Sequence, residues 1–134
     1  MLTIPELEAI MDRSFPSWRM FSQIVALDAR DLTLRMPFRA ELVRAGGTIS
    51  GPALMALADT AAYFITLVHA GDVASAATAN LDIHFLVRPK PHDITAVATM
   101  LRLGRRLSVA KVDLYSDDLL VAHATVTYAL PSPH

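Results

Sequence analysis

The longest apolar stretch of the chain covers residues 51–70, where small and aliphatic residues occupy nearly every position. A helix on a protein surface would show a polar face at this length, and none is visible here. A turn that contains Gly46 and Gly47 precedes the stretch, and Gly71 follows it. The pattern predicts a central helix over residues 51–70 that is buried on nearly every side.

The residues before this helix predict one short helix and two strands. Thr3 and Glu6 have the spacing of a capping box, and apolar residues then recur at helical intervals, so a helix is expected over residues 3–14. Strand-like patterns follow at residues 20–29 and 31–39.

A loop is expected over residues 40–49, and the chain after the central helix reads as strand almost to its end. The four strand-like runs are residues 76–87, 94–103, 107–115 and 119–130. The breaks between the last three runs are only a few residues long, which favours antiparallel hairpins because a parallel crossover needs about a dozen residues. The tail, residues 131–134, is predicted to be disordered.

This order of elements predicts an α+β fold in a single domain, residues 1–134. One very hydrophobic helix beside six strands requires an antiparallel sheet that curls around the helix. Small residues along the helix would let the strands approach it closely.

Composition narrows the possible functions. The chain is 53% hydrophobic and 19% charged, with a net charge of −1, so we expect part of its surface to be hidden in an oligomer and no broad nucleic-acid surface. It has no cysteine, which excludes thiolate sites and a cysteine nucleophile. No secretory signal is visible, so a cytoplasmic location is expected.

Asp59 is the only charged residue of the central helix. A carboxylate at the centre of a membrane span costs about 2.5–3.5 kcal/mol, so a buried helix in a soluble protein is favoured over a membrane span. The residues alone leave two roles for Asp59. It is either hydrogen-bonded to its neighbours for structural reasons or it takes part in chemistry.

Residues 46–61, Gly-Gly-Thr-Ile-Ser-Gly-Pro-Ala-Leu-Met-Ala-Leu-Ala-Asp-Thr-Ala, resemble the hotdog-fold acyl-CoA thioesterases of the phenylacetate-degradation (PaaI-like) type. Residues 78–89 also resemble the next strand of that family. The resemblance implies a hotdog fold and hydrolysis of an acyl-CoA thioester, without a cofactor. It implies that Asp59 is the catalytic carboxylate, that Gly51 supplies the oxyanion hole, and that Thr78 is the hydroxyl residue of the following strand.

The chain departs from the family pattern at three positions. Ser50 stands where the family has His, Pro52 replaces the second Gly, and Arg44 replaces a frequent Asn. Ser is a preferred helix N-cap, so Ser50 caps the helix or positions a water or the carboxylate. Pro is tolerated in the first turn of a helix.

The oxyanion donor and the carboxylate are too far apart to share a substrate within one chain. Gly51 and Asp59 are separated by eight residues, or roughly 12 Å along a helix. Both can act on one carbonyl only if each comes from a different subunit, so we expect a homodimer with shared active sites. A tetramer of two dimers is left open.

The residues expected to contact the acyl-CoA are Arg44, Tyr63, Asn80, Arg88, Lys90, Arg105 and Arg106. Arginine suits the phosphates of CoA because its guanidinium group can make two parallel hydrogen bonds. The basic residues would equally suit solvated turns, and Tyr63 would equally suit the core. On strict strand alternation, Thr78 and Asn80 share one face of their strand. For Thr78 to face the site, the strand needs a β-bulge, or that polar face must line the subunit boundary.

Two other functions remain open. A dehydratase or hydratase of acyl thioesters would need a histidine near the α-proton, and Ser50 stands at the helix start where such a histidine would sit. A non-catalytic acyl-CoA-binding protein is the other alternative. The five histidines show no metal-ligand spacing, so no metal is expected.

Overall fold

The computed structural model describes residues 1–132. Its first half contains α1 (Ile4–Ser14), α2 (Trp18–Phe21), β1 (Gln23–Leu27), β2 (Asp31–Met36), a 3-10 turn (Ala40–Leu42), β3 (Val43–Arg44) and β4 (Thr48–Ile49). Its second half contains α3 (Gly51–Ala70), β5 (Ala77–Phe85), β6 (Ile94–Leu103), β7 (Leu107–Ser116) and β8 (Leu119–Ala129). Of the predicted tail, Pro131 and Ser132 have no regular structure, and residues 133–134 lie outside the described residues.

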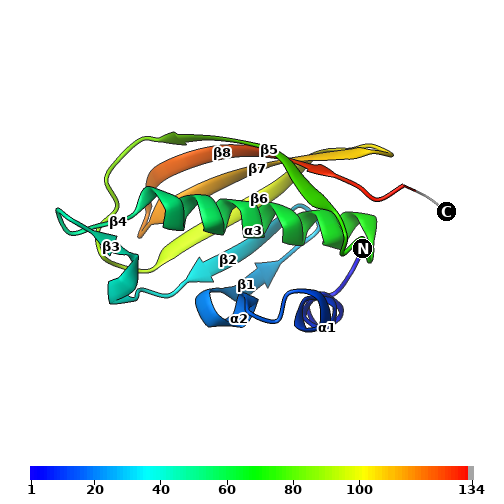
Figure 1. Cartoon of the computed structure of the whole chain (residues 1–134), viewed down its shortest axis with the longest axis horizontal. Coiled ribbons are helices and arrows are strands. Elements are labelled where there is room, and N and C mark those ends of the chain that lie inside the picture. Colours follow the sequence, from blue (N-terminus) through cyan, green and yellow to red (C-terminus); the bar gives the residue numbers. More distant parts are fainter. Residues whose placement is uncertain (133–134) are drawn as a thin grey trace.

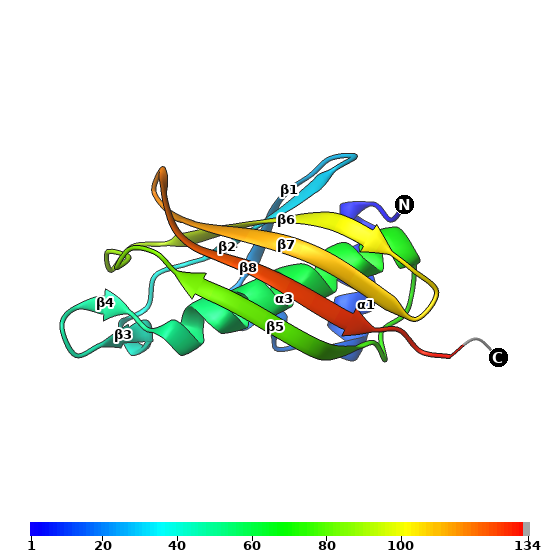
Figure 2. The same cartoon turned by 90° about the horizontal axis from the view of Figure 1, so that it is seen from above.

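Six strands form one antiparallel sheet in the order β1-β2-β6-β7-β8-β5. The sheet curves along one side of α3, while α1 and α2 lie at the β1 end of this layer (Figure 1). Seen from above, the strands run across the helix along most of its length (Figure 2). This is the six-stranded antiparallel sheet around one long helix that the sequence predicted.

The local sequence explains where α3 begins and ends. Ser50 is its N-cap, and the side-chain oxygen of Ser50 accepts a hydrogen bond from the Ala53 amide at 3.2 Å. At the other end Gly71 has φ 88°, a conformation that glycine adopts without a steric penalty. The helix is long and apolar enough to cross a membrane, but most of it is buried as the core helix of this fold.

Burial of α3 is uneven along its length. Pro52, Met55 and Ala56 in the first two turns are exposed, whereas nearly every residue from Leu57 to Val68 is buried. The prediction of burial on nearly every side is therefore wrong for the first two turns. This end of the helix is left open beside a pocket, which is described below.

Two segments differ from the sequence prediction. The expected strand over residues 20–29 starts later, because Trp18 begins the short helix α2 and buries its ring edge-on against Phe64, with ring centroids 5.4 Å apart. The expected loop over residues 40–49 contains the small hairpin β3–β4, whose turn uses the positive φ of Gly46 and Gly47. Two-residue strands are too short to give a periodic signal.

The β5 edge of the sheet is open. Within the described chain β5 pairs only with β8, so one side of its backbone has no strand partner. Apolar side chains continue from its end, with Phe85, Leu86 and Val87 at 51%, 53% and 42% exposure. An open, apolar edge is a surface on which another strand can pair.

Candidate active site

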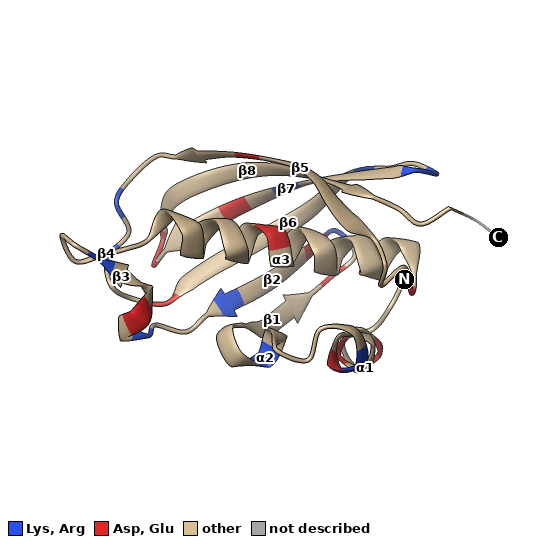
Figure 3. Cartoon of the chain, in the orientation of Figure 1, with Lys and Arg blue, Asp and Glu red and all other residues tan. Residues whose placement is uncertain are grey.

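Asp59 lies in the middle of α3 and is half-buried (Figure 3). Two hydroxyl groups donate to the same carboxylate oxygen: Thr78 Oγ1 to Oδ1 at 2.8 Å and Tyr128 Oη to Oδ1 at 2.7 Å. Tyr128 Oη also lies 3.2 Å from the backbone oxygen of Asp59. Within residues 1–132, Oδ2 has no hydrogen-bond donor. The carboxylate is thus held on one side and available on the other.

A β-bulge turns Thr78 toward Asp59. In the ladder between β5 and β8, Thr78 pairs with Tyr128 whereas Asn80 pairs with Thr127, and the register shifts between them. Thr78 therefore shares the helix-facing side with Tyr128, and Asn80 lies on the outer face with Thr127. Strict alternation would place Thr78 and Asn80 on one face, and the bulge that Thr78 needs in order to face the site is present, because it adds one residue and breaks the alternation.

Tyr128 is the functional candidate that the sequence did not reveal. It follows Ala124 and Val126 on the inward face of β8, a row that predicts only packing. One signal was available, because a buried tyrosine hydroxyl usually requires a hydrogen-bond partner. Burial, and next the bond to Asp59, raise the pKa of the Tyr128 phenol far above its ordinary value. Tyr128 therefore stays protonated and remains a donor.

Tyr63 packs against Tyr128, the tyrosine that donates to this carboxylate. Its ring stacks on that of Tyr128, with centroids 5.5 Å apart and an interplanar angle of 23°. Its hydroxyl donates to the backbone oxygen of Ala74 at 2.6 Å. Desolvation raises the pKa of the Tyr63 phenol. Tyr63 is mostly buried, so its visible role in one chain is to support Tyr128 and to tie the helix to the following loop.

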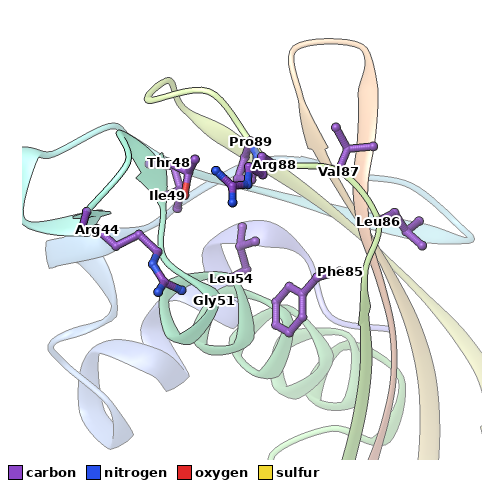
Figure 4. Close-up of a pocket in the computed structure, with 11 residues that line it drawn as sticks. Arg44, Thr48, Ile49, Gly51, Leu54, Phe85, Leu86, Val87, Arg88 and Pro89 are labelled. Atoms are coloured by element: carbon purple, nitrogen blue, oxygen red, sulfur yellow. The ribbon is translucent and has the colours of Figure 1, made fainter.

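The second part of the site is the start of α3. The Gly51 amide is at the first helical position, where an N–H has no acceptor within the helix. Arg44, Gly51 and Arg88 are among the residues that line a pocket of about 480 Å³. Figure 4 shows the two arginine side chains extending from opposite walls, with Leu54 below Arg88 and Phe85 further down.

The Ser50 side chain is occupied as the helix cap, which gives a testable effect on stability. We expect Ser50→Ala to lower the free energy of unfolding by about 1 kcal/mol, the usual cost of losing an N-cap. Urea unfolding of the two proteins measures this difference. An unchanged unfolding midpoint would show that the hydrogen bond to Ala53 does not stabilise the start of α3.

The remaining predicted cations form two separate groups in one chain. Arg88 lies at the pocket, and Lys90 is exposed two residues further along. Arg105 and Arg106 lie in the turn between β6 and β7 and line a second pocket with Arg102. The hairpin that carries them lies at the opposite end of the sheet from β3 and β4 (Figure 3).

Comparison with known proteins identifies the family. The sequence profile of the thioesterase superfamily matches residues 46–123, more than half of the chain and the part that contains Gly51, Asp59 and Thr78. The chain belongs to the thioesterase superfamily. No curated protein matches it in sequence.

Solved structures agree with this membership in the thioesterase superfamily. A protein from Silicibacter sp. TM1040 that is assigned as a thioesterase is 35% identical, with a TM-score of 0.83 over 93% of this chain and 89% of that one. A phenylacetic acid degradation-related protein from Ralstonia eutropha JMP134, also assigned as a thioesterase, is 25% identical, with a TM-score of 0.80 over 87% and 90% of the two chains.

Zebra fish thioesterase superfamily member 2 shares the fold at 21% identity, with a TM-score of 0.81 over 98% of this chain and 100% of that one. The predicted hotdog fold is therefore confirmed. Membership in the superfamily supports thioester hydrolysis as the general activity.

Proposed function

We propose that this superfamily member is an acyl-CoA thioesterase of the phenylacetate-degradation type and that Asp59 is its catalytic carboxylate. The observation that carries the proposal is the unequal hydrogen bonding of the two oxygens of the Asp59 carboxylate. Thr78 and Tyr128 hold one oxygen of Asp59, and among residues 1–132 the other oxygen has no donor. Oδ2 is not among the buried side-chain atoms that lack a partner, so water or a substrate can reach it.

Asp59 has two ways to cleave a thioester. As a general base, it takes a proton from water while the water oxygen attacks the carbonyl carbon, and the CoA thiolate leaves and is protonated. As a nucleophile, its carboxylate oxygen attacks the carbonyl carbon and expels the thiolate. Water then hydrolyses the resulting anhydride. Both routes need a donor for the oxyanion that forms on the carbonyl oxygen.

The Gly51 amide of a partner subunit suits that oxyanion. In the described chain the Gly51 N–H has no acceptor, and the helix dipole favours negative charge at this position. Gly51 and Asp59 are roughly 12 Å apart along α3, so they act on one carbonyl only across a subunit boundary. We therefore propose a homodimer with two shared sites.

The open edge of β5 supports one arrangement of this proposed dimer, in which the two β5 strands pair with each other. Asp59 contacts the start of β5 through Thr78. Gly51 lies against the end of β5, where a Cβ at residue 51 would be 3.5 Å from the Phe85 ring. Antiparallel pairing of two β5 strands places the start of one strand beside the end of the other. Asp59 of one subunit then lies beside Gly51 of the partner subunit.

The same two-fold pairing would bring the two groups of cations together. Leu107, directly after Arg106, is in register with Ala129, which is in register with Ala77 at the start of β5. The hairpin of one subunit then lies on the same side as Arg88 of the partner subunit. We assign these cations to the phosphates of CoA.

This assignment predicts a binding effect for Arg88. We expect Arg88→Gln to raise KM for acyl-CoA several-fold with little change in kcat. The reason is that an exposed ion pair contributes about 1 kcal/mol to binding. Arg30→Gln, in the turn between β1 and β2, is the matched control. An equal rise in KM for both variants would mean that only net charge matters.

The function is tested with a panel of short, medium-chain and aromatic acyl-CoAs, in which release of free thiol is followed. Hydrolysis of at least one thioester is expected, by a species larger than one chain in solution. An active monomer would contradict the shared site. Tight binding without hydrolysis would support the non-catalytic alternative, which is favoured by the use of Ser50 as a cap at the position of the family's histidine.

A further inference from the structure

We infer that Tyr128 is a positioning residue, which together with Thr78 fixes Oδ1 of Asp59 and presents Oδ2 as the reacting oxygen. The inference rests on the proposed function, because it concerns which atom of the same carboxylate acts on the thioester. It adds a residue from β8, the last strand of the chain, to a site that family resemblance places in α3 and β5.

The geometry assigns the two carboxylate oxygens different tasks. Both hydroxyl donors lie on Oδ1, at 2.8 Å from Thr78 and 2.7 Å from Tyr128. Two strong donors occupy the lone-pair positions of that oxygen and draw on its electron density, so it is poorly suited to attack a carbonyl or to accept a proton. Oδ2 keeps its lone pairs.

The two donors act as one unit because they are opposite each other in the sheet. Thr78 and Tyr128 are in register across the β5–β8 ladder, on the side that faces α3. Tyr128 also contacts the backbone oxygen of Asp59 at 3.2 Å, so one hydroxyl touches both the main chain and the side chain of the same residue. This double contact limits rotation of the Asp59 carboxylate about χ2.

Tyr128 is itself rigid. It is 5% exposed, and its ring stacks on Tyr63 at 5.5 Å. Because burial raises the pKa of its phenol, the hydroxyl remains a donor throughout the pH range in which an enzyme would be assayed. A buried and fixed donor orients its acceptor more narrowly than a mobile side chain does. Without it, Thr78 alone would leave the carboxylate free to exchange its two oxygens.

The kinetic test uses Tyr128→Phe, which removes the hydroxyl and keeps the ring. We expect kcat for the best acyl-CoA of the panel to fall about tenfold with KM within about twofold, since the loss is one of orientation and not of substrate binding. Thr78→Val should give a comparable loss and Thr78→Ser should restore most of it. The double variant should lose less than the product of the two single losses.

Ser108→Ala is the matched control. Ser108 is in register with Tyr128 on β7, is buried, and bonds to Thr66 Oγ1 at 2.6 Å and not to Asp59. The Ser108→Ala variant therefore removes a buried hydroxyl that neighbours Tyr128, and it should keep the wild-type kcat. The inference is overturned if Tyr128→Phe keeps kcat, or loses no more than Ser108→Ala, or raises KM in place of lowering kcat.

A second measurement does not depend on turnover. In urea unfolding, Tyr128→Phe should lower the midpoint more in the wild-type background than in the Asp59→Ala background, because only the first has a carboxylate for Tyr128 to hold. Equal shifts in both backgrounds would overturn the inference. Absence of hydrolysis across the acyl-CoA panel would instead refute the proposed function, while the unfolding cycle still decides whether Tyr128 holds Asp59.

Discussion

Asp59→Asn is expected to lower kcat for acyl-CoA hydrolysis by about 10²–10⁴-fold, the range typical for loss of a general base. Asparagine has nearly the same shape and can still accept the bonds from Thr78 and Tyr128 through its amide oxygen. The amide nitrogen then occupies the place of Oδ2, and this nitrogen can neither take a proton from water nor attack a carbonyl. The measurement is steady-state kinetics with the most active thioester of the panel.

Asp82→Asn is the control for this loss. Asp82 is in β5, the strand that carries Thr78, but its side chain lies on the outer face and is exposed. It should therefore retain the wild-type rate. A rate for Asp59→Asn within a few-fold of wild type would return Asp59 to the structural role that its sequence position also allowed.

Gly51→Pro is expected to lower kcat by about 10²–10³-fold, the cost of one oxyanion donor. Proline is accepted at the first helical position, and the extended backbone of Ser50, with φ −71° and ψ 151°, suits a residue before proline. The substitution therefore removes the N–H. Pro52 disfavours the helical region for a bulkier residue 51, and we expect the packing of the rest of α3 to hold the helix start in place. Kinetics and circular dichroism of the purified variant test both expectations.

Gly51→Ala separates loss of the N–H from crowding. A Cβ at this position would lie 3.5 Å from the Phe85 ring, an ordinary contact distance. The alanine variant keeps the amide hydrogen and should lose much less activity than the proline variant. Equal losses would show that space around Gly51, and not its N–H, is what the reaction requires.

The sequence predicted the parts of the fold that depend on long patterns. The apolar stretch over residues 51–70 indicated a central helix, and the short breaks around residues 104–106 and 116–118 indicated the hairpins that join β6, β7 and β8. The sequence did not predict the short elements, because their residues make specific contacts that no long pattern reveals. Trp18 begins α2 to cover Phe64, and β3 and β4 are only two residues long.

The site was predictable only in part, for a physical reason. Asp59 is conspicuous because a charge inside an apolar helix is costly, and Gly51 and Thr78 came from family resemblance. The orientation of Thr78 depends on a bulge, which strict alternation cannot show. Tyr128 is 69 residues from Asp59 in sequence, so their hydrogen bond depends on the pairing of β5 with β8 and on the packing of α3 against both.

The shared site is tested most directly by combining two inactive variants in one dimer. Asp59→Asn and Gly51→Pro are produced together with different affinity tags, and the mixed dimer is purified on both. One of its two sites then contains the intact Asp59 of the Gly51→Pro chain and the intact Gly51 of the Asp59→Asn chain. We expect about half of the wild-type activity per dimer from this one site. Activity no higher than the mean of the two parent variants would contradict a site built from two subunits.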